Sequence, residues 1–130
     1  MTTYEPGAPL PELRVTPDRF LTYRYAGASG DFNPIHLDEA FALQVGLPGR
    51  ILHGLWTMAQ VARAQTEAAG DPAALASLSV EFRGMGVPEV EVIVSSAVAD
   101  VLADGTVVVS TEASQGDAAL VRGGRAVLRP

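Results

Sequence analysis

The sequence predicts an α+β protein in which an antiparallel sheet packs against one long, largely buried helix. Apolar residues recur at helical spacing up to about residue 70 and alternate at strand spacing after about residue 75. Helices followed by a run of strands are typical of this class. The 130 residues fit a single domain, 1–130, because the chain contains no linker, internal repeat or low-complexity tract.

The first part of the chain predicts a short strand and a helix. The segment Pro11–Val15 (PELRV) fits the strand. Thr16 then precedes a proline and an aspartate, which is the pattern of an N-cap followed by a first helical turn. Gly27 and Gly30 predict the end of that helix.

Two further helices are expected. Asp38 fits the N-cap and Gly46 the C-cap of a short one. The longest helical pattern is Gly54–Ala69, which would span about 24 Å. Its polar stripe consists of Thr57, Gln60, Arg63 and Glu67. The wide apolar arc away from this stripe predicts that the helix is largely buried, and it contains Leu55, Met58, Ala59 and Ala62.

The last part of the chain predicts antiparallel strands joined by turns. The expected strands are 75–82, 89–102, a strand through Val107 and Val109, and 119–130. Asp104-Gly105 is a strong hairpin turn pattern, and residues 115–117 form a second turn. Gly123-Gly124 inside the last strand predicts a β-bulge.

The composition excludes several kinds of function. The net charge of −6 gives no bulk attraction to nucleic acid or to an anionic membrane. The chain has no cysteine and no lysine, which excludes disulfides, thiolate chemistry and lysine Schiff bases. Its start lacks the pattern of a secretory signal, and no apolar run reaches the length of a membrane span, so we expect a cytoplasmic protein.

The stretch SGDFNPIHLDEAF, Ser29–Phe41, concentrates chemically active side chains in a chain that has only two histidines. Pro34 disfavours helix at the residue before it, so Asp31 and His36 should flank a restricted turn. Imidazole is the usual general acid or base near neutral pH, and a carboxylate can orient it, hold a water or act as the base. The pair predicts the addition of water to a polarised double bond, or its removal.

Other interpretations of these residues stay open. In a purely structural one, Asp31 caps a turn and His36 satisfies a local carbonyl. A metal site would draw on Asp31, His36, Asp38 and His53, but the chain lacks HxH and HExxH spacing. A serine hydrolase would need a GxSxG turn, which is also missing.

A second stretch, ILHGLWTMA or Ile51–Ala59, places His53 and Gly54 where the longest helix begins. Unpaired N–H groups and the positive end of the helix dipole lie at that position. A glycine lets another group approach the backbone, so the Gly54 N–H is a candidate oxyanion donor, unless Gly54 is only a bend. For His53 we favour a buried, hydrogen-bonded side chain over a catalytic one.

Taken in order, SGDFNPIHLDEAFA and ILHGLWTMA resemble the MaoC-like hydratase and dehydratase family, which includes the (R)-specific enoyl-CoA hydratases. Residues 25–63 carry the motifs, and the layout of most of the chain agrees. The resemblance is closest to small single-domain (3R)-hydroxyacyl-thioester dehydratase subunits. It implies a hot-dog fold, in which the sheet wraps around the central helix. Leu52 replaces the small residue common in the family, which affects only the expected shape of the pocket.

The resemblance also implies roles for four residues. Asp31 and His36 would activate the water that adds to a trans-2-enoyl thioester, or that leaves a (3R)-hydroxyacyl thioester, of CoA or an acyl carrier protein. The Gly54 N–H would bind the thioester carbonyl and Asn33 would brace the loop, without a metal or other cofactor. The family further implies a dimer, formed with a second copy or with a related hot-dog subunit.

Two alternatives come from other functional classes. A thioesterase on the same fold would direct water at the carbonyl carbon instead of the double bond. A non-enzymatic subunit would hold substrate for a partner in a hetero-dimer. The intact pair of Asp31 and His36 argues against both alternatives.

Overall fold

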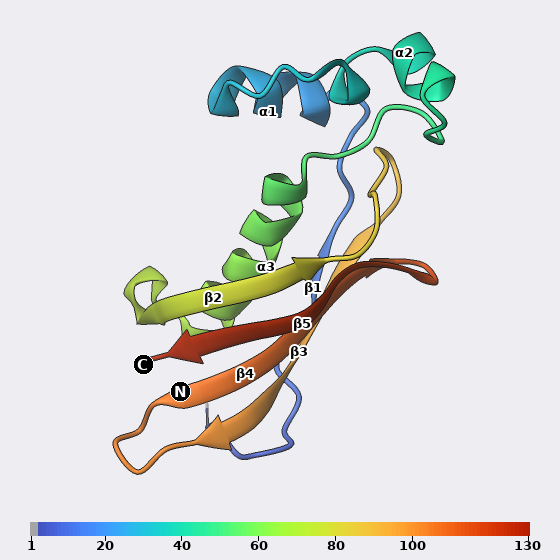
Figure 1. Ribbon diagram of the computed structural model, residues 1–130. Coiled ribbons are helices and arrows are strands. Elements are labelled where there is room, and N and C mark those ends of the chain that lie inside the picture. The colour runs from blue at the N-terminus through green and yellow to red at the C-terminus, as the bar shows by residue number, and fades with distance from the viewer. Residues whose placement is uncertain (1–2) are drawn as a thin grey trace.

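The structure, a computed structural model, describes residues 3–130 and shows a curved sheet with a long helix against one face (Figure 1). Its five antiparallel strands have the order β1-β3-β4-β5-β2. They are β1 (Leu13–Val15), β2 (Leu75–Phe82), β3 (Val92–Val101), β4 (Val107–Gln115) and β5 (Ala118–Leu128). The long helix is α3 (Gly54–Ala69), with the bounds that the sequence predicts. The predicted α+β class is confirmed.

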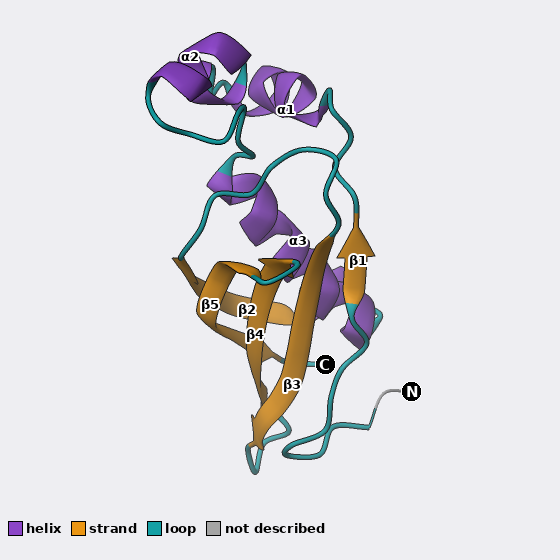
Figure 2. Ribbon diagram, turned by 90° about the vertical axis from the view of Figure 1, so that its right-hand side faces the viewer, coloured by secondary structure: helices purple, strands orange, loops and turns teal. Residues whose placement is uncertain are grey.

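The contact between α3 and the sheet forms the core (Figure 2). Trp56, Val61 and Ala64 of α3 lie in one buried cluster with Val94 of β3 and Val121 of β5. Burying an apolar side chain of valine size or larger contributes roughly 1.5–3 kcal/mol. This packing fixes the position of α3 and, with it, the position of the residues at its first turn.

The buried face of α3 differs from the predicted one. Gln65 is fully buried, and its Nε2 donates to Ser96 Oγ at 3.0 Å and to Thr111 Oγ1 at 3.3 Å. Leu55, which was expected inside, is 64% exposed, and Ala59 is exposed as well. Gln65 was not part of the predicted polar stripe. Two distant strands supply partners for its Nε2, while its Oε1 has no hydrogen-bond partner among the described residues. An apolar stripe therefore stays uncovered on the other side of α3.

The segment between β1 and α3 projects beyond the end of the sheet and lies over the start of α3, and we call it the overhang (Figures 1 and 2). It contains α1 (Leu21–Ser29), the 3₁₀ turn η1 (Pro34–His36) and α2 (Glu39–Gln44). The predicted N-cap of α2 is confirmed, because the Asp38 side chain accepts a hydrogen bond from the Phe41 N–H. The C-cap of α2 is Val45, one residue before the predicted Gly46.

The predicted start of α1 is wrong. The helix begins after Phe20 and not at Thr16, because Asp18 Oδ1 accepts a hydrogen bond from the Phe20 N–H at 2.8 Å and forms a turn first. Gly30 caps the end of the helix with a φ of 78°, as predicted. Gly27 lies within the helix instead of ending it.

The predicted strands are present, although β3 begins at Val92 and not at residue 89, where Glu89 has a φ of 72°. The order of the strands in the sheet does not follow the chain. Turns at Asp104-Gly105 and 115–117 connect β3 to β4 and β4 to β5. The predicted bulge at Gly123-Gly124 is confirmed by a shift of the β4–β5 register between Thr111 and Ala113. In contrast, β2 pairs with β5 at the edge of the sheet and is not a neighbour of β3.

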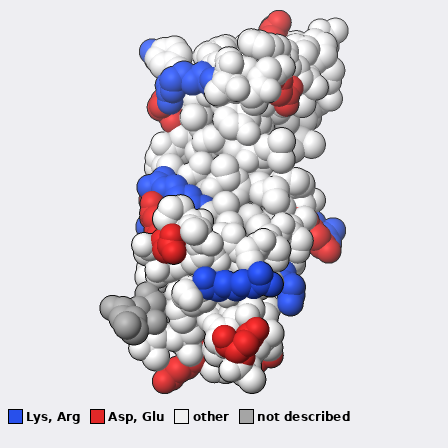
Figure 3. Space-filling model, turned by 90° about the vertical axis from the view of Figure 1, so that its left-hand side faces the viewer, with Lys and Arg blue, Asp and Glu red and all other residues white. Residues whose placement is uncertain are grey.

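None of the helices in residues 3–130 is long and apolar enough to cross a membrane. On the face in Figure 3, acidic and basic side chains lie in small mixed groups between wide uncharged areas. Exposed side chains of opposite charge also pair in the described chain, as Arg63 does with Glu67 and Arg83 with Glu81. This face therefore presents no broad positive field of the kind that attracts nucleic acid.

Candidate active site

The loop that precedes η1 is shaped by its own side chains. The Asp31 N–H donates to Ser29 Oγ, and Asp31 Oδ1 accepts from the Asn33 N–H, both at 3.2 Å. Asn33 Oδ1 in turn accepts from the Ile35 N–H at 3.2 Å. Such bonds from a side chain to the backbone two residues on are typical of Asx turns. They hold Asp31 and His36 at the two ends of one restricted turn.

His36 lies at the end of this turn and is 7% exposed. Its Nδ1 is 2.8 Å from the Ile51 carbonyl oxygen. A carbonyl oxygen only accepts, so Nδ1 carries the ring hydrogen, and Nε2 of the neutral ring presents a lone pair. This Nε2 lies 3.8 Å from Oδ2 of Asp31, whose side chain is 52% exposed. An acceptor nitrogen and a carboxylate oxygen thus face each other at the edge of the site.

The structural interpretation of this pair accounts for only some of its polar atoms. Asp31 Oδ1 caps the turn and His36 Nδ1 satisfies a carbonyl, as that interpretation expects. Within residues 3–130, no hydrogen bond uses Asp31 Oδ2 or His36 Nε2. These two atoms remain available for chemistry.

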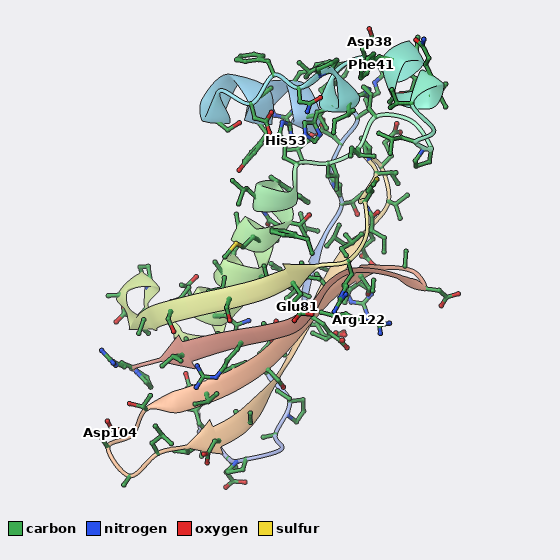
Figure 4. The ribbon with its side chains drawn as sticks, viewed as in Figure 1. Asp38, Phe41, His53, Glu81, Asp104 and Arg122 are labelled. Atoms are coloured by element: carbon green, nitrogen blue, oxygen red, sulfur yellow. The ribbon has the colours of Figure 1, made fainter. Side chains whose placement is uncertain are left out.

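His53 is the last residue of the overhang and lies between α1 and the start of α3 (Figure 4). It is 3% exposed and its Nε2 is 3.1 Å from the Asp31 carbonyl oxygen, which confirms the predicted buried, hydrogen-bonded side chain. Its ring centroid lies 3.8 Å from that of His36, at 21°, and 4.7 Å from that of Tyr25. Burial lowers the pKa of His53, the bond to the Asp31 backbone opposes this shift, and the neighbouring His36 adds to it.

The lowered pKa predicts a pH dependence of stability. As the pH falls through 6.5, the ordinary pKa of the side chain, His53 takes up a proton in the unfolded chain before it does so in the folded one. The free energy of unfolding therefore decreases as the pH drops below 6.5. Above that pH the stabilising contribution of neutral His53 is fully present. We expect His53→Gln to lose less stability than the wild type between about pH 7.5 and about pH 5.5 in urea unfolding. Equal losses in the two proteins would show that another group is responsible.

Gly54 is the first residue of α3 and follows the N-cap, His53. The His53 carbonyl accepts from the N–H groups of Trp56 and Thr57, but no residue in the described part of the chain accepts from the Gly54 N–H. A methyl group added at Gly54 would lie 3.3 Å from the Phe82 ring. The site therefore contains an unpaired donor at the positive end of a helix dipole, next to an aromatic ring.

Three potential metal ligands come together here. Ligand atoms of Asp31, His36 and His53 lie within 4.8 Å of one another, and among the described residues Asp38 does not join this group. A metal ion lies near the plane of each imidazole that binds it. The two rings stack at 3.8 Å with a tilt of 21°, so their planes do not meet near the nitrogen atoms. This geometry favours proton chemistry over a shared ion.

Two contacts of the site have no signal in the sequence. The Ile51 carbonyl fixes the tautomer of His36, and a backbone group can belong to any residue type. Phe82 fits a buried face of an alternating strand, yet it lies at the end of β2, is 51% exposed and adjoins Gly54. Both contacts depend on how distant segments meet.

Most of the chain matches the model of one protein family. Residues 5–117 match the model of the MaoC like domain. The chain belongs to the MaoC-like family. This MaoC-like chain is 41% identical over 73 residues to the peroxisomal enoyl-CoA hydratase 2 of Arabidopsis thaliana, over 55% of this chain and 23% of that protein. The match thus spans less than a quarter of that relative's length.

Solved structures match the MaoC-like fold over nearly the whole chain. The ChsH1-ChsH2 complex from Mycobacterium tuberculosis matches with a TM-score of 0.85 and 26% identity, over 98% of each chain. An (R)-hydratase from A. caviae involved in PHA biosynthesis matches with a TM-score of 0.87 and 24% identity, over 100% of both chains. These likenesses confirm the predicted hot-dog arrangement of the sheet around α3.

Proposed function

We propose that this chain hydrates trans-2-enoyl thioesters to (3R)-hydroxyacyl thioesters and catalyses the reverse dehydration. The observation that carries the proposal is the pair of acceptors His36 Nε2 and Asp31 Oδ2, which face each other at 3.8 Å. A water molecule has two O–H donors and can give one to each acceptor. Such a water directs its lone pairs away from the pair and toward a bound substrate. The hydratase named among the relatives supports this choice of reaction.

The proposed pair can supply and take up every proton that hydration and dehydration require. In hydration, the water oxygen bonds to C3, its proton passes to the pair, and the electrons of the C2–C3 double bond move toward the carbonyl oxygen. A proton then returns to C2, so the enzyme ends unchanged. In dehydration the pair removes the C2 proton and protonates the leaving hydroxyl. Neutral His36 and ionised Asp31 are the states that accept hydrogen bonds from water.

The Gly54 N–H is the proposed donor to the thioester oxygen as that oxygen becomes enolate-like. A donor that is already fixed at a helix N-terminus stabilises this charge without rearrangement. Leu55 and Phe82, both mostly exposed beside Gly54, supply apolar surface for the acyl chain. Asn33 braces the loop through its Oδ1.

An acyl-thioesterase is the second candidate, because the Gly54 N–H would serve equally as an oxyanion donor for attack on the carbonyl carbon. Incubation of the purified chain with crotonyl-CoA separates the two functions. Hydration removes the enoyl absorbance and leaves the thioester intact, whereas hydrolysis releases a free thiol. We expect loss of absorbance without thiol release. Release of thiol at the rate of substrate loss would reject the hydratase.

We also propose that the active form is a dimer, with a second copy or with a related subunit. Strand β2 lies at an edge of the sheet, and α3 leaves Leu55 and Ala59 exposed. Exposed strand edges and apolar helix faces are normally covered by another chain or segment. The ChsH1-ChsH2 structure is a complex of two differently named chains, which supports a related subunit as the alternative partner.

Ala59→Glu is expected to weaken this dimer, because it places two like charges across a two-fold interface. Sedimentation velocity of the wild type should show a dimer, and that of Ala59→Glu a monomer. The matched control is Ala103→Glu, the same change at an exposed position in the turn between β3 and β4. A wild-type monomer with full activity would contradict the proposal, and so would an undisturbed Ala59→Glu dimer.

A further inference from the structure

His53 contacts both members of the proposed pair, through two different kinds of interaction. Its Nε2 lies 3.1 Å from the carbonyl oxygen of Asp31, and its ring stacks on the His36 ring at 3.8 Å. The other hydrogen bonds of Asp31 in the described chain go to Ser29 and Asn33, within its own loop. Because His53 is the buried N-cap of α3, this bond ties the exposed loop to the N-terminus of that helix.

The protonation state of the His53 ring is compatible with its contacts to Asp31 and His36. The Asp31 carbonyl only accepts, so His53 Nε2 carries the hydrogen of a neutral ring. Burial lowers the pKa of His53, which keeps the ring neutral near neutral pH. A neutral ring can stack on His36 whether or not His36 carries a proton, whereas a second cation 3.8 Å away would repel the protonated form. His53 can thus hold the geometry without exchanging protons.

We propose that His53 is a positioning residue, which fixes the gap between Asp31 Oδ2 and His36 Nε2 by clamping the Asp31 backbone and stacking on the His36 ring. The inference rests on the proposed hydratase function. His53 is also the N-cap of α3, so it sets the place of the Gly54 N–H relative to the pair. A misplacement of about 1 Å in such a constellation can cost about 10²-fold in rate.

Two variants separate the hydrogen bond of His53 to the Asp31 carbonyl from its stacking on the His36 ring. His53→Gln keeps an N–H donor for the Asp31 carbonyl and loses the ring, whereas His53→Phe keeps a flat ring and loses the donor. We expect kcat for crotonyl-CoA hydration to fall about threefold to tenfold in His53→Gln and about tenfold to a hundredfold in His53→Phe, with KM changed less than about threefold. In a His36→Ala background both changes should lower kcat by a far smaller factor. The gap that they disturb lies between Asp31 and His36, and this background already lacks the His36 imidazole.

Val109→Ala is the control for general destabilisation. Val109 is fully buried in a second core cluster with Leu128, on strands β4 and β5 away from the overhang. This change should lower Tm and leave kcat unchanged. Amide hydrogen exchange at Asn33 and Ile35 gives a readout that does not depend on catalysis. It should be faster in His53→Phe than in His53→Gln or Val109→Ala.

Three outcomes would overturn the positioning role of His53. They are equal losses of kcat in the wild-type and His36→Ala backgrounds, a His53→Phe protein more active than His53→Gln, and unchanged exchange at Asn33 and Ile35 in His53→Phe. A wild type that fails to hydrate crotonyl-CoA, while exchange responds as stated, would leave the clamp in place and reject the proposed function instead.

Discussion

Asp31→Asn and His36→Ala are each expected to lower the turnover of crotonyl-CoA hydration by about 10²-fold or more. Asp31→Asn keeps the shape of the side chain but removes the negative charge of the carboxylate, which is proposed to accept a hydrogen bond and then a proton from water. His36→Ala removes the Nε2 lone pair that faces Asp31 at 3.8 Å. Because both groups are proposed to hold one water, the double variant should be only slightly worse than the worse single variant.

Asp71→Asn is the matched control for Asp31→Asn. Asp71 Oδ1 accepts from the Ala73 N–H at 2.9 Å, in the same kind of turn that Asp31 forms with Asn33, but beyond the other end of α3. This control should keep full turnover. Circular dichroism should show that all these variants remain folded. Hydration at nearly the wild-type rate by Asp31→Asn or His36→Ala would contradict the assignment of the pair.

Gly54→Pro is expected to lower turnover by about 10²–10³-fold, because it deletes the proposed oxyanion donor. The fold should tolerate this change. Gly54 is the first residue of α3, where the N–H has no partner within the helix, and a proline fits that position. His53 precedes it with a ψ of 133°, in the extended region that a following proline requires.

Gly54→Ala is the control for this prediction, since it keeps the N–H. Proline and alanine both add a Cβ, which would lie 3.3 Å from the Phe82 ring, so both variants meet the same neighbour. We expect similar Tm values and far lower turnover for proline. Equal losses in the two variants would mean that close approach to the backbone matters and not the donor. Retained hydration in Gly54→Pro would reject the donor role.

The parts of the fold that depend on local sequence could be predicted. The bounds of α3 follow from a helical pattern that starts at Gly54 and stops before Gly70, which caps the helix with a φ of 70°. Asp31 and His36 stand five positions apart around a turn that Pro34 restricts, so their proximity is also a local property. The hairpin turn at Asp104-Gly105 is predictable for the same reason.

The parts that depend on distant contacts could not be predicted. The buried face of α3 includes Gln65 only because Ser96 and Thr111 arrive there from β3 and β4. The hydrogen bond between His53 and Asp31 joins two loops 22 residues apart. A helical or alternating pattern shows which residues share a face, but it does not show what that face meets.

The position of a labelled oxygen atom tests the central claim most directly. The purified chain is incubated with crotonyl-CoA in water labelled with heavy oxygen, and the products are resolved by chiral chromatography and mass spectrometry. We predict that the label appears on the C3 hydroxyl of intact (3R)-hydroxybutyryl-CoA, and that Asp31→Asn lowers its rate of appearance by about 10²-fold. Label in the carboxylate of a free acid, or in the (3S) product, would contradict the account.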